Sequence, residues 1–252
     1  MGLIRRFVPE KFQAPLLRMV PWMKKGVHWG WQRYCPVCHS RLRGFIRSPQ
    51  QPDVRGACPV CGSLPRHRMV WVFLDHHPEL FESRPCKLLH VAPEEVLERR
   101  FRARPGVEYL SIDLVSPKAM QHMDITALEL DDASVDAIFC SHVLEHVQDD
   151  RQGLREFRRI LRPGGWMIQM IPHSTLLEHT LEDPSIVSPQ DRFRVYGWYD
   201  HVRLYGRDLV DRIREAGFEV EHLASTDLVD ERQVRRMGLQ RESLFMARRP
   251  KD

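Results

Sequence analysis

The sequence has no apolar run of about 18 residues, the length that a helix needs to cross a bilayer, so we expect no transmembrane segment. Its first residues lack the continuous apolar centre of a signal peptide, because Pro9, Pro15 and Pro21 interrupt a mixture of basic and apolar side chains. Long polar tracts are absent, and so are internal repeats beyond two short cysteine motifs. These absences predict a cytoplasmic protein whose 252 residues form one medium-sized domain with a small appendage.

Acidic residues are scarce at the front of the chain. Residues 1–68 contain 13 Lys or Arg and only 2 Asp or Glu, a net charge of +11, whereas the remaining residues carry −7. This asymmetry favours an anionic partner for the front part, either a nucleic acid or an anionic membrane surface. Docking of the front part on the acidic remainder of the same chain explains the charge equally well.

Residues 1–34 are predicted to form a basic amphipathic arm. Their apolar side chains can line one side of short helices between the prolines, which argue against a single long helix. Such a segment binds an anionic membrane or packs on a partner. Packing against the rest of this chain is the alternative.

Cysteine occurs only six times, but four of the six form two identical Cys-Pro-Val-Cys motifs, Cys35/Cys38 and Cys58/Cys61. Two pairs at this spacing supply the four thiolates of a tetrahedral Zn2+ site of the zinc-ribbon type. Four thiolates leave no coordination position open, so this zinc would be structural and would hold residues 35–68 together. Two disulfides or a redox pair are the alternatives.

Residues 69–252 are predicted to form one α/β domain. Short apolar strands alternate with amphipathic helices, the pattern of a parallel sheet covered on both faces. The predicted strands are 87–92, 108–113, 135–140, 166–171, 218–223 and 243–248, and the predicted helices are 94–102, 151–161 and 207–216. Residues 172–206 are too many for an ordinary strand-to-helix connection, so we expect them to form a lid over the strand ends.

Several polar residues follow these strands directly. Asp113 ends the second predicted strand, 21 residues after Ala92 ends the first, which is where a carboxylate binds ribose hydroxyls in dinucleotide folds. Asp124 precedes the third strand, and Ser141 and His142 follow it. Taken alone, each Asp is as readily a helix cap or a turn residue.

Three segments resemble the class I S-adenosylmethionine-dependent methyltransferases. They are Asp124-Ile125, residues 136–147 (DAIFCSHVLEHV) and residues 161–166 (LRPGGW). Residues 35–248 as a whole are similar to a bacterial subgroup of that family with an N-terminal zinc ribbon, marked by CPVCGSLPRHR at 58–68 and YDHVRLYG at 199–206.

The resemblance implies a Rossmann-like sheet of seven strands with a reversed final hairpin, and S-adenosyl-L-methionine bound across the strand ends. By this analogy, Asp113 would bind the ribose, and Asp124 with the backbone of Ile125 would hold the adenine. The segment His142-Val143-Leu144-Glu145-His146 also matches the H-x-x-E-H signature of some zinc proteases. No third ligand is evident, so we interpret His142 as lining the cofactor or substrate cleft.

The first loop departs from the family pattern. Related enzymes have an acidic residue and several glycines there, whereas this chain has His90-Val91-Ala92-Pro93-Glu94-Glu95. His90 stands at the place of the acid, and no glycine is present to reach positive φ at low cost. His90, Ala92 and Pro93 are the candidate contacts of the methionine part of the cofactor, which would sit differently or bind weakly.

Groups suited to catalysis occur in and around the predicted lid. Methyl transfer from a sulfonium needs an aligned nucleophile, exclusion of water and sometimes a base. His201 or His173 is the candidate base, and Arg203 the candidate site for an anionic group of the acceptor. A structural hydrogen-bonded cluster of Asp200, His201 and Arg203 is the alternative.

The sequence therefore predicts a methyltransferase that acts on a small-molecule, sugar or lipid-linked acceptor. The first alternative is an RNA methyltransferase that binds phosphates through residues 1–68. The second is a catalytically silent, zinc-stabilised binding module, suggested by the glycine-free first loop. The acceptor atom and the oligomeric state do not follow from the sequence.

Overall fold

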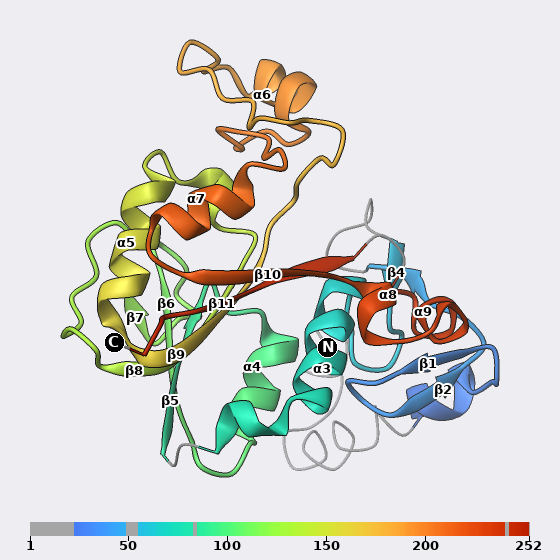
Figure 1. Cartoon of the computed structure of the whole chain (residues 1–252). Coiled ribbons are helices and arrows are strands. Elements are labelled where there is room, and N and C mark those ends of the chain that lie inside the picture. The colour runs from blue at the N-terminus through green and yellow to red at the C-terminus, as the bar shows by residue number, and fades with distance from the viewer. Residues whose placement is uncertain (1–22, 49–54, 83–84, 240–241, 252) are drawn as a thin grey trace, which may run out of the picture. The chain divides into compact units, whose positions relative to one another are not determined.

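The computed structural model describes residues 23–48, 55–82, 85–239 and 242–251 (Figure 1). Most of the predicted basic arm lies outside the described residues. By their contacts the residues form two compact units. Unit 1 comprises Met1–His76 and Ser225–Glu242, and unit 2 comprises His77–Ala224 and Ser243–Asp252. Residues 69–76 and 225–242, which the sequence analysis placed in the α/β domain, thus cluster with the cysteine motifs.

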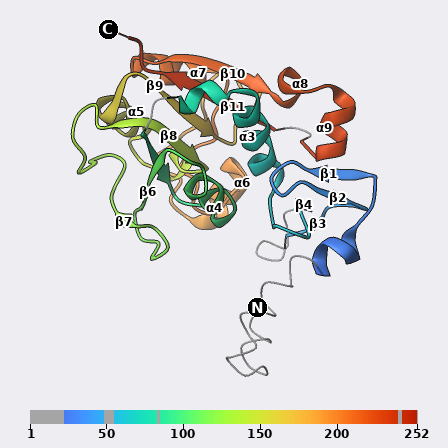
Figure 2. The ribbon, with the colours of Figure 1, turned by 90° about the horizontal axis from the view of Figure 1, so that it is seen from below.

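The described residues of unit 1 form two short hairpins, a helical stretch at 23–28 and three further helices. Strand β1 (Arg33–Cys35) pairs antiparallel with β2 (Ser40–Leu42), and β3 (Ile46–Arg47) pairs antiparallel with β4 (Arg55–Ala57). The three further helices are α3 (Pro65–His76), α8 (Ser225–Leu228) and α9 (Glu231–Met237). Helix α9 packs beside the β1–β2 hairpin, as Figures 1 and 2 both show.

Arg68, on α3, joins the parts of unit 1 that are distant in sequence. Its fully buried guanidinium donates hydrogen bonds to the carbonyls of Gly56 (2.9 Å) and Ser63 (2.7 Å) near the cysteines. It also donates to the carbonyls of Met237 (2.6 Å) and Gly238 (3.1 Å) at the end of α9. A hydrogen bond to a charged group contributes about 1.5–3 kcal/mol, so Arg68 stabilises the packing of the end of α9 within unit 1.

Unit 2 is built on a seven-stranded sheet in the order β7-β6-β5-β8-β9-β11-β10. The strands are β5 (Cys86–Val91), β6 (Val107–Asp113), β7 (Gln121–His122), β8 (Val135–Ser141), β9 (Leu161–Met170), β10 (Glu219–Ala224) and β11 (Ser243–Arg248). The first five are parallel, and β11 runs antiparallel to both β9 and β10. The predicted seven strands and reversed final hairpin are confirmed.

The two faces of this sheet are covered by different helices. Leu89 and Ile138 alternate along their strands with His90 and Phe139, so the two pairs lie on opposite faces. The first pair packs in the core with α5 (Asp150–Ile160) and α7 (Leu209–Glu215), and the second pair contacts Phe101 of α4 (Glu95–Arg102). The sheet therefore has helices on both faces, as predicted.

Strand β9 begins five residues earlier than the sequence predicts. Leu161 pairs with Val135, and the register then shifts so that Trp166 pairs with Ala137. The intervening Pro163-Gly164-Gly165 forms a bulge in which Gly164 has φ +75°. A Cβ on Gly165 would meet the carbonyl oxygen of Asp136 at 2.9 Å, so the bulge requires glycine there.

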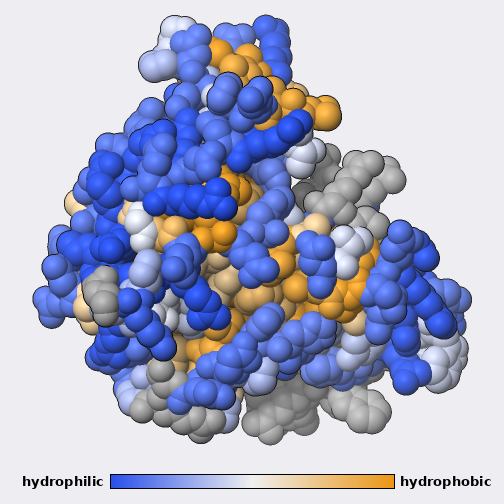
Figure 3. Space-filling model, in the orientation of Figure 1, coloured by the Kyte–Doolittle hydropathy of each residue, from blue (hydrophilic) through white to orange (hydrophobic). Residues whose placement is uncertain are grey.

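Residues 172–206 form a folded extension rather than a simple loop. Isolated bridges join His173 to Tyr205 and Leu181 to Leu204, and the segment contains helix α6 (Pro189–Tyr196). Hydrophobic side chains gather on the surface around α6 (Figure 3). In the same extension, the rings of Phe193 and Tyr199 stack with centroids 4.6 Å apart. Among the helices of the described ranges, none combines the length and apolar character that a membrane crossing requires.

Candidate cofactor cavity and metal centre

A cavity of about 760 Å³ lies at the carboxyl ends of β5, β6 and β8. Pockets for small ligands usually measure about 300–1,000 Å³, and open parallel sheets bind ligands at this edge. Five of the eight predicted cofactor residues line it, namely Ala92, Asp113, Asp124, Ile125 and His142. The chain therefore brings together residues that span 51 positions of the sequence.

Asp113 and Asp124 are both turn residues and cavity residues. Oδ1 of Asp113 accepts hydrogen bonds from the backbone N–H groups of Val115 (2.9 Å) and Ser116 (2.7 Å). Oδ1 of Asp124 accepts from the N–H and the hydroxyl of Thr126, both at 2.8 Å. In each carboxylate these bonds orient the group, and Oδ2 has no hydrogen-bond partner in the described ranges. The two interpretations of each Asp are therefore compatible.

The first loop reaches a left-handed backbone conformation without glycine. Ala92 has φ +50°, and its N–H donates to the carbonyl of Ile112 at 2.8 Å. His142, directly after β8, has φ +54° and donates its N–H to the carbonyl of Met170 at 2.8 Å. For a residue with a Cβ this conformation costs about 1–2 kcal/mol. Strain of this kind persists where the surrounding structure enforces it, and here it occurs twice beside one cavity.

Three predicted cofactor contacts do not line the cavity. His90 is fully buried on the α4 face, with Nδ1 2.9 Å from the hydroxyl of Tyr109 and its ring against Phe139. Strand alternation explains this, because the neighbouring Val91 faces the cavity instead. Pro93 and Ser141 also lie off the cavity lining. The hydroxyl of Ser141 is buried and has no hydrogen-bond partner among the described residues.

A group of histidines surrounds a buried carboxylate beside this cavity. Glu145 lies in the short 3-10 helix η2 (Leu144–His146), with Nδ1 of His142 at 3.3 Å and Nε2 of His201 at 4.0 Å from Oε1. The rings of His146 and His201 meet edge to face with centroids 4.8 Å apart. Asp200 lies 3.3 Å from Nδ1 of His146. The H-x-x-E-H segment is thus a tight turn after a strand and not the helix of a zinc protease.

His201 is the one predicted base that lies near the cavity. Burial lowers the pKa of His201, although the Glu145 carboxylate opposes the shift. A lowered pKa favours the neutral imidazole, the form that accepts a proton or binds a metal. His173 lies elsewhere, with Nδ1 3.2 Å from the carbonyl of Ile171 and its ring packed against His222 of β10.

The geometry places Arg203 in a structural cluster. Its guanidinium is 4% exposed and donates to Glu182 (2.8 Å) and to the backbone carbonyls of Leu144 (3.0 Å), Val147 and Gln148 (2.8 Å). All of these acceptors belong to the protein itself. This favours a structural role for Arg203 over the binding of an anionic group of the acceptor. Burial raises the pKa of Glu182, but hydrogen bonds from Arg212 and Arg203 outweigh it and lower the value to about 2.

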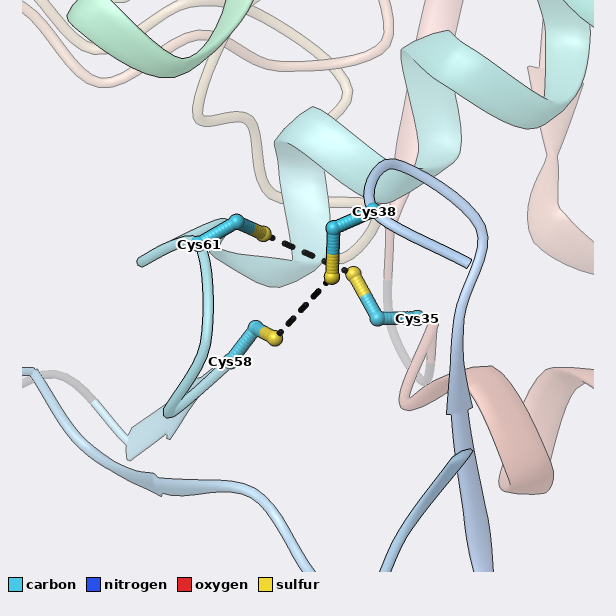
Figure 4. A group of neighbouring side chains, drawn as sticks. All are labelled: Cys35, Cys38, Cys58 and Cys61. Atoms are coloured by element: carbon cyan, nitrogen blue, oxygen red, sulfur yellow. Dashed lines mark hydrogen bonds between the residues drawn. The ribbon is translucent and has the colours of Figure 1, made fainter. Parts of the chain in front are cut away.

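In unit 1 the four cysteines of the two motifs converge on one point (Figure 4). The sulfur pairs Cys35–Cys61 and Cys38–Cys58 are each 3.7 Å apart. A tetrahedral site with Zn–S bonds of about 2.3 Å separates its sulfurs by about 3.8 Å. The spacing therefore fits a zinc ion bound by four thiolates, and all four cysteines are free of disulfides.

Hydroxyl groups complete the surroundings of these sulfurs. The hydroxyl of Ser63 lies 3.1 Å from Sγ of Cys35 and 3.2 Å from Sγ of Cys61. The hydroxyl of Ser40 lies 3.2 Å from Sγ of Cys38. Groups that donate to metal-bound thiolates stabilise their negative charge. The residues present thus fit a structural zinc ion and its outer shell.

The sequence analysis missed part of the cavity wall. Leu114 and Val115, directly after Asp113, line the cavity and remain 63% and 76% exposed. The sequence does contain a signal for them, because two apolar residues directly follow an Asp at the end of a strand. An apolar or aromatic ligand in the cavity would cover both side chains. The other missed residues are Val91, Met123, Thr126, Val143, His146, Val147, Gln148, Asp149 and Asp200.

The central part of unit 2 matches a known family. Residues 92–169 match the methyltransferase domain family. A protein of Mycolicibacterium smegmatis, described as a probable S-adenosylmethionine-dependent methyltransferase, is 33% identical over 103 residues. A 37.1 kDa protein of a Streptomyces fradiae transposon is 37% identical over 98 residues. The matches cover 40% and 38% of this chain but only 35% and 28% of the relatives, so the chain spans about a third of their length.

Solved structures share the architecture at low identity. A chain from the complex between the Trm112 methyltransferase activator of Haloferax volcanii and a methyltransferase superposes with a TM-score of 0.51. It is 18% identical, and the match covers 74% of this chain and 91% of that one. At this identity the likeness concerns the fold alone.

Proposed function

This chain carries a class I S-adenosylmethionine-dependent methyltransferase domain, and from this premise we propose that it transfers a methyl group to a small-molecule acceptor. The proposal rests on one observation: a cavity at the strand ends of unit 2 joins Ala92, Asp113, Asp124 and Ile125. Bound S-adenosylmethionine supplies an electrophilic methyl group on a sulfonium, so the protein must hold this cofactor, exclude water and orient the acceptor.

The cavity residues suit the parts of this cofactor. Oδ2 of Asp113, with Oδ1 occupied by two backbone donors, is available to accept hydrogen bonds from ribose hydroxyls. Leu114 and Val115 offer the exposed apolar surface that an adenine ring would cover. Asp124 and the backbone of Ile125 would hold the polar edge of adenine. The backbone of Ala92, already in the left-handed conformation, would approach the methionine part.

We further propose that Cys35, Cys38, Cys58 and Cys61 bind one structural zinc ion. The tetrahedral spacing and the hydroxyls of Ser40 and Ser63 support this assignment. With all four positions taken by thiolates, the ion has no place for a substrate and contributes to folding only.

The experiment that tests the methyltransferase proposal is calorimetry of the zinc-loaded protein with S-adenosylmethionine and S-adenosylhomocysteine. We expect saturable binding of one molecule per chain for both. The absence of heat at millimolar ligand would contradict the proposal and favour a catalytically silent binding module. Methyl-labelled S-adenosylmethionine, added together with cellular small molecules or with RNA, then identifies the fraction that receives the label.

RNA is the second candidate acceptor, because unit 1 exposes aromatic and basic side chains together. Trp29 and Trp31 are 50% and 60% exposed, and the guanidinium of Arg41 lies 4.5 Å from the ring centre of Trp31. Exposed aromatic rings beside cations bind unpaired bases by stacking. This candidate predicts RNA binding that weakens steeply as salt is added. Binding that is absent, or that does not depend on salt, removes it.

A further inference from the structure

Glu145 occupies an unusual position for a carboxylate. It is 1% exposed, and neither side-chain oxygen accepts a hydrogen bond from any described residue. A buried carboxylate without partners costs several kcal/mol unless a cation compensates its charge. Two imidazole nitrogens lie near its Oε1, namely Nδ1 of His142 at 3.3 Å and Nε2 of His201 at 4.0 Å.

The surrounding histidines have the arrangement of metal ligands. One ligand atom from each of Glu145, His146 and His201 lies within 4.8 Å of the other two. Two or three imidazoles with one carboxylate form the donor set of catalytic zinc sites and of many iron and manganese sites. The set is separate from the four cysteines, which belong to unit 1.

The backbone holds these residues in place although they lie far apart in the sequence. The N–H of Val202 donates to the carbonyl of Glu145 at 2.9 Å, which fixes the His201 segment against η2. Arg203, one residue further, donates to the carbonyls of Leu144 and Gln148. Asp200, at 3.3 Å from Nδ1 of His146, supplies the carboxylate–imidazole contact that commonly orients a metal-bound histidine.

We propose that Glu145, His146 and His201 bind a divalent transition-metal ion at the edge of the cofactor cavity. His142, His146 and Asp200 also line that cavity, so a ligand of the metal can come from the cavity side. On the proposed function this ligand is a hydroxyl oxygen of the methyl acceptor. A bound divalent metal lowers the pKa of such an oxygen and fixes its position. The acceptor class is therefore an oxygen nucleophile that can chelate a metal.

The test counts metal ions per chain by mass spectrometry after equilibrium dialysis of the full chain against micromolar zinc. We expect two zinc ions in the wild type, one in Glu145→Gln, one in His201→Ala, and two in His173→Ala. The last variant is the matched control, because His173 lies in the same extension but packs on His222. Cys58→Ser should also retain one zinc ion, and the double variant C58S/H201A should retain none.

A second measurement uses Mn2+, which favours oxygen and nitrogen donors over thiolates. Calorimetry of wild-type protein from which a mild chelator has removed the histidine-site zinc, leaving one zinc per chain, should show one Mn2+ site that H201A weakens at least tenfold and H173A leaves unchanged. Far-ultraviolet circular dichroism of each variant checks folding, and H201A decides the case if E145Q does not fold.

One zinc per chain in the wild type together with no Mn2+ binding would overturn the metal site, as would unchanged Mn2+ affinity in folded H201A. The outcome is independent of the cofactor. Metal binding without binding of S-adenosylhomocysteine would refute the methyltransferase proposal but support the metal-site proposal. Binding of S-adenosylhomocysteine without metal binding would support the methyltransferase proposal and refute only the metal site.

Discussion

The cysteine cluster of unit 1 and the histidine cluster of unit 2 bring together side chains that can bind metal, and they do so in opposite ways. The cysteines come from two short motifs, and the four sulfurs form a closed set. The histidine cluster combines the turn at His142–His146 with His201, 55 residues beyond His146, and it borders an open cavity. A closed set of local ligands suits folding, whereas an open set assembled by the tertiary structure suits a reaction.

The largest effect in this comparison is expected from Cys58→Ser. Removing one thiolate should release the zinc proposed for unit 1, and structural zinc contributes about 10–16 kcal/mol in small zinc domains. We expect unit 1 to unfold and to become sensitive to protease, with unit 2 still binding S-adenosylhomocysteine. The control is Cys86→Ser, a buried cysteine on β5 that does not belong to the cluster. A C58S protein that keeps the cysteine-site zinc would refute the ligand set.

The scaffold of the histidine cluster is tested by Arg203→Ala. This change leaves the buried Asp150 and the partly exposed Glu182 without one of their cations, and breaking a buried ion pair costs about 3–5 kcal/mol. We expect a clear loss in the free energy of unfolding, measured by urea denaturation. Arg194→Ala is the control, because its ion pair with Asp191 is exposed and should contribute under about 1 kcal/mol. Equal stabilities would mean that Arg203 is not structural.

The cavity itself is tested by Asp113→Ala. Loss of hydrogen bonds between a carboxylate and ribose hydroxyls should weaken binding of S-adenosylhomocysteine by about 10- to 150-fold, or about 1.5–3 kcal/mol. Asp183→Ala is a matched control, because Asp183 also accepts a hydrogen bond from a backbone N–H two residues later (Ser185) but does not line the cavity. Calorimetry that gives wild-type affinity for D113A would refute the ribose assignment.

The smallest effect is expected at the glycine-free loop. Ala92→Gly removes a Cβ from a left-handed residue and should raise the free energy of unfolding by up to about 1 kcal/mol. Ala103→Gly, at φ −82°, should instead lower it by about 0.5–1 kcal/mol. If the midpoint of thermal unfolding rises in Ala92→Gly and falls in Ala103→Gly, the result supports strain at Ala92. A lower midpoint for both would show that no strain is stored there.

The sequence predicts the sheet of unit 2 well because its strands are short apolar runs between turns. Strand β11 is predicted with the same bounds as observed, and α5 differs by one residue at each end. The start of β9 is missed, because the pairing of Leu161 with Val135 depends on a partner strand and not on local residue preferences.

The candidate site is only partly predictable from the sequence. Asp113 and Asp124 can be found because they follow the strand pattern, and the cysteines because of their spacing. His90 fails because one step along a strand reverses the face that a side chain occupies. His146 and His201 show no joint signal, because only the tertiary structure brings them together.

The contacts of Arg68 have a consequence for how the protein can be made. Two of its four carbonyl partners lie at residues 237 and 238, so a ribosome must synthesise the chain through residue 238 before this arginine has all four partners. The proposed zinc can bind the four cysteines before helices α8 and α9 are synthesised, so it would support unit 1 before its last segment is present. A fragment that ends at His76 would keep the metal ligands but leave a buried cation half solvated, so the cysteine-bearing part is not a portable module.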